Sequence, residues 1–151
     1  MRWGYYSIEQ KVRKLRLVAL NTNLYARKGG NRLQALHPET AASSSLGGDD
    51  DPGGQWAWLE AVLDKCMRSR ETVYLIGHAA PGADERHTNG NGHEGPFQER
   101  YNQRYLQIVR KYASIIVGQF FGHLHADTFR VVYNEHGICC GQILTTLTRY
   151  P

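Results

Sequence analysis

The chain has 151 residues, of which 41% are hydrophobic and 21% charged, a balance typical of one ordinary globular domain. Its formal net charge of +4 arises from 18 basic and 14 acidic residues that are scattered along the chain, and this pattern does not indicate nucleic-acid binding. Three cysteines, Cys66, Cys139 and Cys140, form no complete disulfide framework. No stretch has the apolar length of a membrane span, and the N-terminus lacks the apolar core of a signal peptide.

The first half of the chain predicts one strand, one long loop and one helix. Residues 15–20 are rich in apolar and branched side chains and predict a strand. Residues 26–54 are rich in glycine, serine and aspartate, which is typical of a surface loop. Over residues 55–66, apolar side chains recur at helical spacing and therefore predict an amphipathic helix that packs against a core.

The second half predicts a further alternation of strands and a helix. Residues 72–76 form a short run of branched and aromatic side chains that predicts a strand, and a polar loop follows at 83–96. Residues 97–112 carry apolar side chains at helical spacing, and strands are predicted at 114–120 and 129–133. This order predicts an α/β fold with only three or four strands.

Three histidines follow the predicted strands and suggest a metal site. His78 and His123 each stand behind a glycine just after a strand, and His125 follows His123 by two residues. On extended backbone, a His-x-His pair places both rings on one side, and neighbouring strands would bring His78 to them. Imidazole ligands favour zinc over magnesium or calcium. On spacing alone, the alternative that these are ordinary surface or core histidines stays open.

The other titratable residues are weaker candidates for ligands. A two-metal site also needs carboxylates, yet Asp127 is expected to follow the outgoing strand in a structural role. Asp84, Glu85, His87 and His93 stand in the polar loop and have no ligand-like spacing. The chain contains neither a Gly-x-Ser-x-Gly nucleophile motif nor a phosphate-binding glycine loop. These residues therefore predict no alternative catalytic centre.

Several segments together resemble a known enzyme family. Residues 120–129 read Phe-Phe-Gly-His-Leu-His-Ala-Asp-Thr-Phe, and residues 77–82 read Gly-His-Ala-Ala-Pro-Gly. With residues 20–25, 55–59 and 97–111, they are similar to the acid sphingomyelinase and acid sphingomyelinase-like phosphodiesterase family, which belongs to the calcineurin-like metallophosphoesterases. The resemblance covers about residues 15–135.

The resemblance implies a fold, a cofactor and a reaction. The fold would be a metallophosphoesterase β-sandwich flanked by helices, and the cofactor would be a pair of zinc ions. His78 and His123 would bind one metal and His125 the other. The implied reaction is attack of a metal-activated hydroxide on a phosphodiester such as sphingomyelin or a nucleotide-like substrate. The resemblance also implies an extracellular or lysosomal location, with contact to a lipid surface only in a full-length protein.

The sequence also departs from the family pattern. The family's Asp-x-His and Gly-Asn-His-Glu motifs are absent, so no catalytic acid or base is assigned. Residues 90–94 imitate the second motif but contain an inserted glycine. We therefore expect residues 1–136 to be the C-terminal part of a metallophosphoesterase domain whose N-terminal half is missing, and residues 137–151 to be a divergent tail.

Two functional hypotheses follow from these observations. In the first, the chain is an incomplete fragment of a zinc-dependent phosphodiesterase and has little or no activity by itself. In the alternative, it is a truncated, catalytically inactive isoform that binds a partner or has no function. An unrelated α/β domain is a third reading that the combined motifs disfavour.

Overall fold

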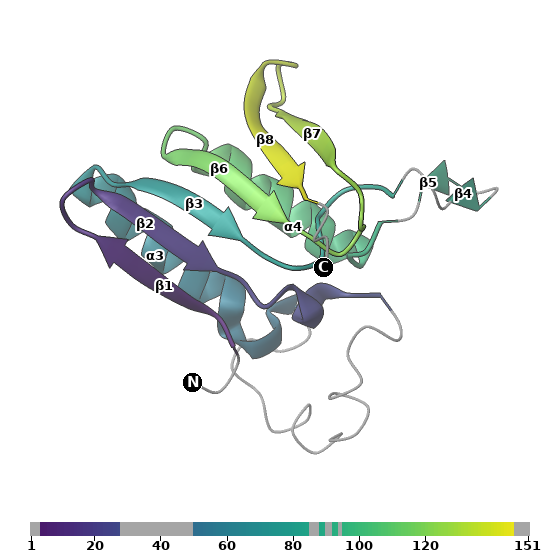
Figure 1. The fold of residues 1–151 in the computed structure, drawn as a ribbon, viewed down its shortest axis with the longest axis horizontal. Helices are drawn as coiled ribbons and strands as arrows, with labels where there is room; N and C mark the ends of the chain where they lie inside the picture. The colour runs from purple at the N-terminus through teal and green to yellow at the C-terminus, as the bar shows by residue number, and fades with distance from the viewer. Residues whose placement is uncertain (1–3, 28–49, 85–87, 90–91, 94, 147–151) are drawn as a thin grey trace, which may run out of the picture.

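The computed structural model describes residues 4–27, 50–84, 88–89, 92–93 and 95–146 (Figure 1). Its largest element is a mixed six-stranded sheet with the order β1-β2-β3-β6-β8-β7. These strands are β1 (Tyr6–Gln10), β2 (Leu15–Ala19), β3 (Thr72–Ile76), β6 (Ile116–Phe121), β7 (Thr128–Tyr133) and β8 (Cys139–Thr145). The other elements are the helices α3 (Gln55–Ser69) and α4 (Glu99–Lys111), the 3-10 turns η1 (Thr22–Tyr25) and η3 (Pro52–Gly54), and a small hairpin of β4 (Thr88–Asn89) and β5 (Gly92–His93).

The centre of the sheet is parallel and its two margins are antiparallel. β2, β3 and β6 run parallel, and β8 runs parallel to β6. β1 pairs antiparallel with β2, and β7 pairs antiparallel with β8. The α/β class is therefore confirmed, and the mixed sheet agrees with part of a metallophosphoesterase fold. Because parallel strands end at the same edge, the C-terminal ends of β3 and β6 lie together.

The prediction of only three or four strands is wrong. β1 was not predicted, because its five residues are mostly polar and exposed and carry only two large apolar side chains, Tyr6 and Ile8. Nor was β8 predicted, which the structure places between β6 and β7 in the main sheet. The division of the chain at residue 136 stays a prediction, although β8 packs as an integral strand.

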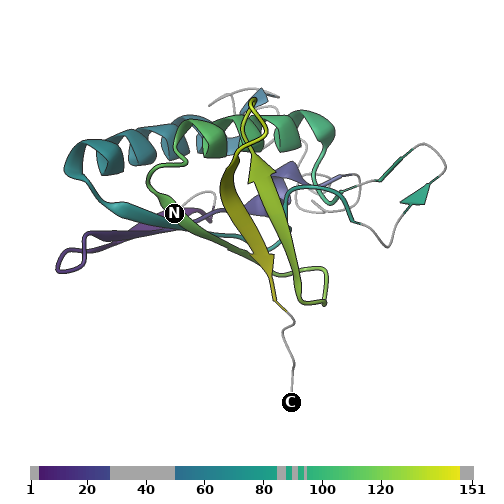
Figure 2. The same cartoon turned by 90° about the horizontal axis from the view of Figure 1, so that it is seen from above.

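Both described α-helices cover the same face of the sheet (Figure 2). α3 begins where the Asp51 carboxylate accepts hydrogen bonds from the backbone amides of Trp56 at 2.7 Å and Ala57 at 3.0 Å. The two predicted helices are confirmed, with α3 extending three residues further, to Ser69. Among the described residues, no helix is long and apolar enough to cross a membrane.

The core lies between these helices and the sheet. Tyr25 stacks on Trp56 with ring centroids 4.0 Å apart, and Phe97 meets Tyr25 edge-on. The Tyr105 hydroxyl donates a hydrogen bond of 2.6 Å to Gln119 inside the core. Aromatic rings from distant segments therefore join η1, α3 and α4 into one packed layer.

The opposite face of the sheet carries partly exposed apolar side chains. Ile8, Ile76 and Phe129 are 52%, 39% and 70% exposed, and on β3 Ile76 directly follows Leu75, which is buried under the helices. The two described α-helices bury one face of the sheet. Because the other face carries these exposed apolar side chains, it has the composition of a packing surface.

Candidate metal centre

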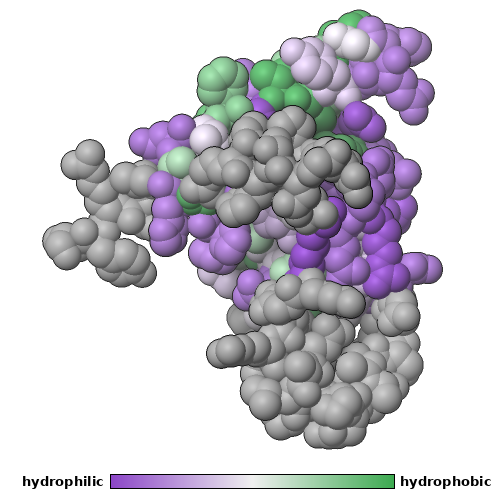
Figure 3. Space-filling model, turned by 90° about the vertical axis from the view of Figure 1, so that its right-hand side faces the viewer, coloured by the Kyte–Doolittle hydropathy of each residue, from purple (hydrophilic) through white to green (hydrophobic). Residues whose placement is uncertain are grey.

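The sheet brings His78 and His123 to the same place. β3 and β6 are parallel neighbours, and the pairing continues past β3 because the amide of Gly77 donates to the carbonyl of Phe120 at 3.0 Å. The amide of Gly122 then donates to the carbonyl of His78 at 2.9 Å. The first residues after both strands are thereby held side by side. Figure 3 views this side of the molecule, where hydrophilic side chains predominate on the described surface.

The two imidazole rings face each other at short range. Nε2 of His78 lies 3.2 Å from Nδ1 of His123, and the ring planes are inclined by 78°. Both side chains are exposed to solvent. With one nitrogen protonated and the other not, the two rings can share a hydrogen bond. With both nitrogens unprotonated, their lone pairs can bind a common electrophile such as a metal ion.

The backbone of the His-x-His segment is not extended, and this part of the prediction is wrong. His123 has φ 71° and His125 has φ 52°, so both lie in the left-handed region. The segment bends tightly, with the amide of Leu124 donating to the carbonyl of Gly122 at 2.8 Å and the Leu124 side chain buried. Histidine tolerates this region better than branched residues do. Because the bends break the alternation of a strand, the spacing of the two histidines no longer implies a common direction of their rings.

The structure brings together fewer candidate ligands than the sequence suggested. Within the described residues, no group of three or more His, Cys, Asp or Glu side chains lies close enough to hold a metal ion. His125 and Asp127 are both exposed, whereas Asp84 is buried. His78, His123 and His125 as a set of metal ligands therefore stay a prediction. Glu85 and His87 lie outside the described residues, and His93 belongs to β5.

A buried hydroxyl that no sequence motif indicated supports the turn that carries His78. Thr22, at the start of η1, accepts hydrogen bonds on Oγ1 from the amides of His78 at 3.2 Å and Ala79 at 2.9 Å. A Cβ on Gly77 would lie 2.7 Å from Cγ2 of Thr22 and 2.6 Å from Cε1 of Phe121. The position of Thr22 two residues after the predicted strand at 15–20 is the only sequence signal for this role.

The loop that follows His78 is held from two further elements. The guanidinium of Arg130 on β7 donates hydrogen bonds to the carbonyls of Pro81 and Ala83. The side-chain amide oxygen of Asn102 on α4 accepts a bond of 2.8 Å from the amide of Gly82. Side chains from a helix and a strand thus fix the path of this loop next to the paired histidines.

Comparisons with known proteins identify relatives of the chain. It is 38% identical over 123 residues to human "Acid sphingomyelinase-like phosphodiesterase 3b", covering 82% of this chain and 23% of the relative. It is 34% identical over 137 residues to "Cyclic GMP-AMP phosphodiesterase SMPDL3A" of Rattus norvegicus, covering 89% and 26%. It is 31% identical over 132 residues to "Sphingomyelinase phosphodiesterase C" of Dictyostelium discoideum, covering 87% and 25%. A scan against models of protein families gave no match.

The fold and these relatives define the class of the chain. A mixed α/β sheet with helices packed on it agrees with part of a metallophosphoesterase fold. The chain belongs to the acid sphingomyelinase-like phosphodiesterase family, as the resemblance of residues 77–82 and 120–129 predicted. It spans about a quarter of the length of the curated relatives that it matches.

Proposed function

We propose that this chain supplies the histidine-bearing part of a metal-dependent phosphodiesterase centre. The observation that carries the proposal is the 3.2 Å approach of Nε2 of His78 to Nδ1 of His123 at the C-terminal ends of two parallel strands. The names of the relatives, which are phosphodiesterases, support hydrolysis of a phosphodiester as the reaction. The substrate would be sphingomyelin or a nucleotide-like phosphodiester.

Zinc is the metal that this pair of ligands fits best. Two nitrogens at about 2.05 Å from a tetrahedral zinc ion are about 3.3 Å apart, close to the 3.2 Å between the two histidine nitrogens. Bound zinc would polarise a phosphoryl oxygen and lower the pKa of a bound water. The chain's own part is to hold two neutral imidazoles in fixed positions. Thr22 and Gly122 form hydrogen bonds with the backbone of His78 that keep it in place. In this proposal His125 serves a second metal ion.

The complete centre would need more ligands than the described residues bring together. A binuclear site requires bridging and terminal carboxylates, and no group of three candidate ligands gathers within the described part of the chain. We therefore assign no catalytic acid or base to this chain. In the alternative reading, the same shortage favours a catalytically inactive isoform. By family membership, we propose an extracellular or lysosomal location for the complete protein.

The metal content of the folded chain tests the first part of the proposal. The chain would be saturated with zinc, freed of excess metal and analysed by mass spectrometry for bound ions. We expect bound zinc in the wild type and a loss of it in His123→Ala. His136→Ala is the matched control, because His136 is an exposed histidine in the turn between β7 and β8. Equal zinc content in all three proteins would contradict the proposed centre.

A chimera tests the reaction. This chain would replace its matching segment, 23% of the length, in human acid sphingomyelinase-like phosphodiesterase 3b. We expect the chimera to hydrolyse a chromogenic phosphodiester and the same chimera with His123→Ala to lose this activity. A folded chimera without hydrolysis would favour the inactive isoform over the phosphodiesterase.

A further inference from the structure

A β-bulge interrupts the pairing of β8 with β7 at two adjacent cysteines, Cys139 and Cys140. Val132 of β7 pairs with Gly141, but the next residue, Tyr133, pairs with Cys139, so Cys140 is one extra residue on β8. In a regular strand, neighbouring side chains point to opposite faces. A bulge interrupts this alternation and re-aims a side chain. Cys139 and Cys140 both line one cavity of about 600 Å³.

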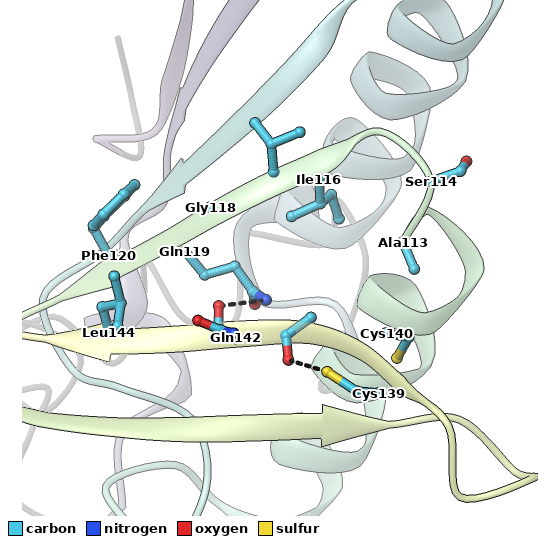
Figure 4. Close-up of a pocket in the computed structure, with 12 residues that line it drawn as sticks. Ala113, Ser114, Ile116, Gly118, Gln119, Phe120, Cys139, Cys140, Gln142 and Leu144 are labelled. Atoms are coloured by element: carbon cyan, nitrogen blue, oxygen red, sulfur yellow. Dashed lines mark hydrogen bonds between the residues drawn. The ribbon is translucent and has the colours of Figure 1, made fainter.

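The cavity exists because β6 and β8 separate along their length. They pair only at their C-terminal ends, Phe120 with Leu144 and Phe121 with Thr145. Before that point the strands diverge, and the side chain of Gln119 bridges the gap, donating from Nε2 to the carbonyl of Gln142 at 3.1 Å. Figure 4 shows both cysteines on the stretch of β8 that borders this gap.

Both cysteines are free thiols that a ligand can reach. Cys139 is exposed and Cys140 is half-buried. Their sulfur atoms make only weak contacts with backbone carbonyls, Cys139 with Gly141 at 3.8 Å and Cys140 with Val132 at 3.4 Å. The third cysteine, Cys66, is buried between α3 and the sheet and does not line this cavity.

The rest of the cavity wall decides which ligand chemistry fits. Among the described residues that line it there is no carboxylate and no imidazole, so a hard cation would find no charged oxygen ligand. A direct disulfide between adjacent residues is strained, because the short link between them resists normal disulfide geometry. An atom inserted between the two sulfurs relaxes this constraint. Soft thiolate pairs select soft ions such as Cu(I).

We propose that Cys139 and Cys140 form a dithiol site that chelates one soft monovalent cation of the Cu(I) class. Two thiols lose their protons and two sulfur–copper bonds form, so that one Cu(I) is bound and two protons are released without change of oxidation state. This site is separate from the paired histidines, and the proposal does not depend on phosphodiesterase activity.

The test is an anaerobic competition for Cu(I) between the chain and a chromogenic Cu(I) chelator. We expect one Cu(I) per wild-type chain, with an affinity that Cys139→Ser and Cys140→Ser each weaken by about 10²- to 10⁴-fold, because the second bond is no longer intramolecular. Cys66→Ala and the double variant His78→Ala/His123→Ala are the controls and should bind Cu(I) as the wild type does.

Two outcomes of this competition would argue against the proposed dithiol site. Wild-type affinity in either single cysteine variant would overturn it, as would a loss of Cu(I) in the double histidine variant with both cysteines intact. Circular dichroism verifies that each variant is folded. If Cys140→Ser does not fold, Cys139→Ser still decides the question, since Cys139 is exposed and its substitution leaves the core intact.

Discussion

Oγ1 of Thr22 accepts two hydrogen bonds from the turn that carries His78, one from the amide of His78 itself at 3.2 Å and one from that of Ala79 at 2.9 Å. Thr22 is 1% exposed, and Ala79, whose amide makes the shorter of the two bonds, is buried as well. A side chain 56 residues upstream of His78 in the sequence therefore determines where this histidine stands.

Removal of this hydroxyl should loosen the turn. In Thr22→Val, the buried amide of Ala79 and the partly buried amide of His78 lose their acceptor at similar side-chain volume, and we expect a loss of about 1–3 kcal/mol in the free energy of unfolding. Hydrogen exchange should show the amides of His78 and Ala79 losing protection. Thr22→Ser is the control, because it keeps the hydroxyl and should retain that protection. Equal protection in the valine variant would refute the role of Thr22.

A methyl group at Gly77, the residue before His78, should also destabilise the turn that carries His78. Its Cβ would lie 2.6 Å from Cε1 of Phe121, so the Gly77→Ala side chain requires the core to shift. We expect a cost of about 1–3 kcal/mol in urea unfolding. Gly122→Ala is the matched control after the neighbouring strand, because its Cβ would meet only His78, at 3.8 Å from Nδ1 and 4.0 Å from the carbonyl oxygen. If both variants lose the same stability, close packing at Gly77 is not the cause.

The buried ion pair of Arg16 and Glu71 should make stability depend on pH. The guanidinium donates to the carboxylate at 2.8 Å and 3.1 Å. Burial by itself would raise the pKa of Glu71, but hydrogen bonds from Ser69 and Arg16 outweigh it and hold the pKa below its ordinary value. Because the folded-state pKa is lowered, the stabilisation is full above about pH 4.5, the ordinary value, and is lost as the pH falls through the folded-state pKa.

Glu71→Gln should therefore be less stable than the wild type by about 2 kcal/mol at pH 7, and this difference should shrink below about pH 4.5. Urea midpoints measured between pH 7 and pH 3 would show it. Glu60→Gln is the control, because Glu60 pairs with Arg104 and Lys111 at the surface, where such pairs contribute less than about 1 kcal/mol. A difference for Glu71→Gln that stays constant with pH would contradict the titration of this carboxylate.

The hydrogen bond from Tyr105 to Gln119 should join α4 to the sheet energetically. Tyr105→Phe leaves Oε1 of Gln119 buried without its donor, and we expect a loss of about 1–3 kcal/mol in the free energy of unfolding. Tyr133→Phe, at an exposed tyrosine, should change stability by less than about 0.5 kcal/mol. In the double variant Tyr105→Phe/Gln119→Met, the effects should not add, because both remove one interaction. Additive effects would show that the hydrogen bond between Tyr105 and Gln119 is not the source of the lost stability.

Much of this fold was predictable from local pattern. The branched run at 72–76 and the helical spacing of apolar residues at 55–66 correspond to β3 and α3. β1 and β8 escaped prediction for physical reasons. β1 is an edge strand with exposed polar residues, and it is ordered by backbone pairing with β2. In β8 the bulge at Cys140 breaks the alternation by which a strand is recognised.

The sequence by itself determined that His78 and His123 each follow a glycine at the end of a strand, because strand propensity and glycine position are local properties. It also contained the family signature at residues 120–129. Only the tertiary structure decided that β3 and β6 are neighbours, that the two rings meet at 3.2 Å, and that His123 and His125 lie on left-handed backbone. These features depend on hydrogen bonds and packing between segments far apart in the chain, which no local stretch of sequence contains.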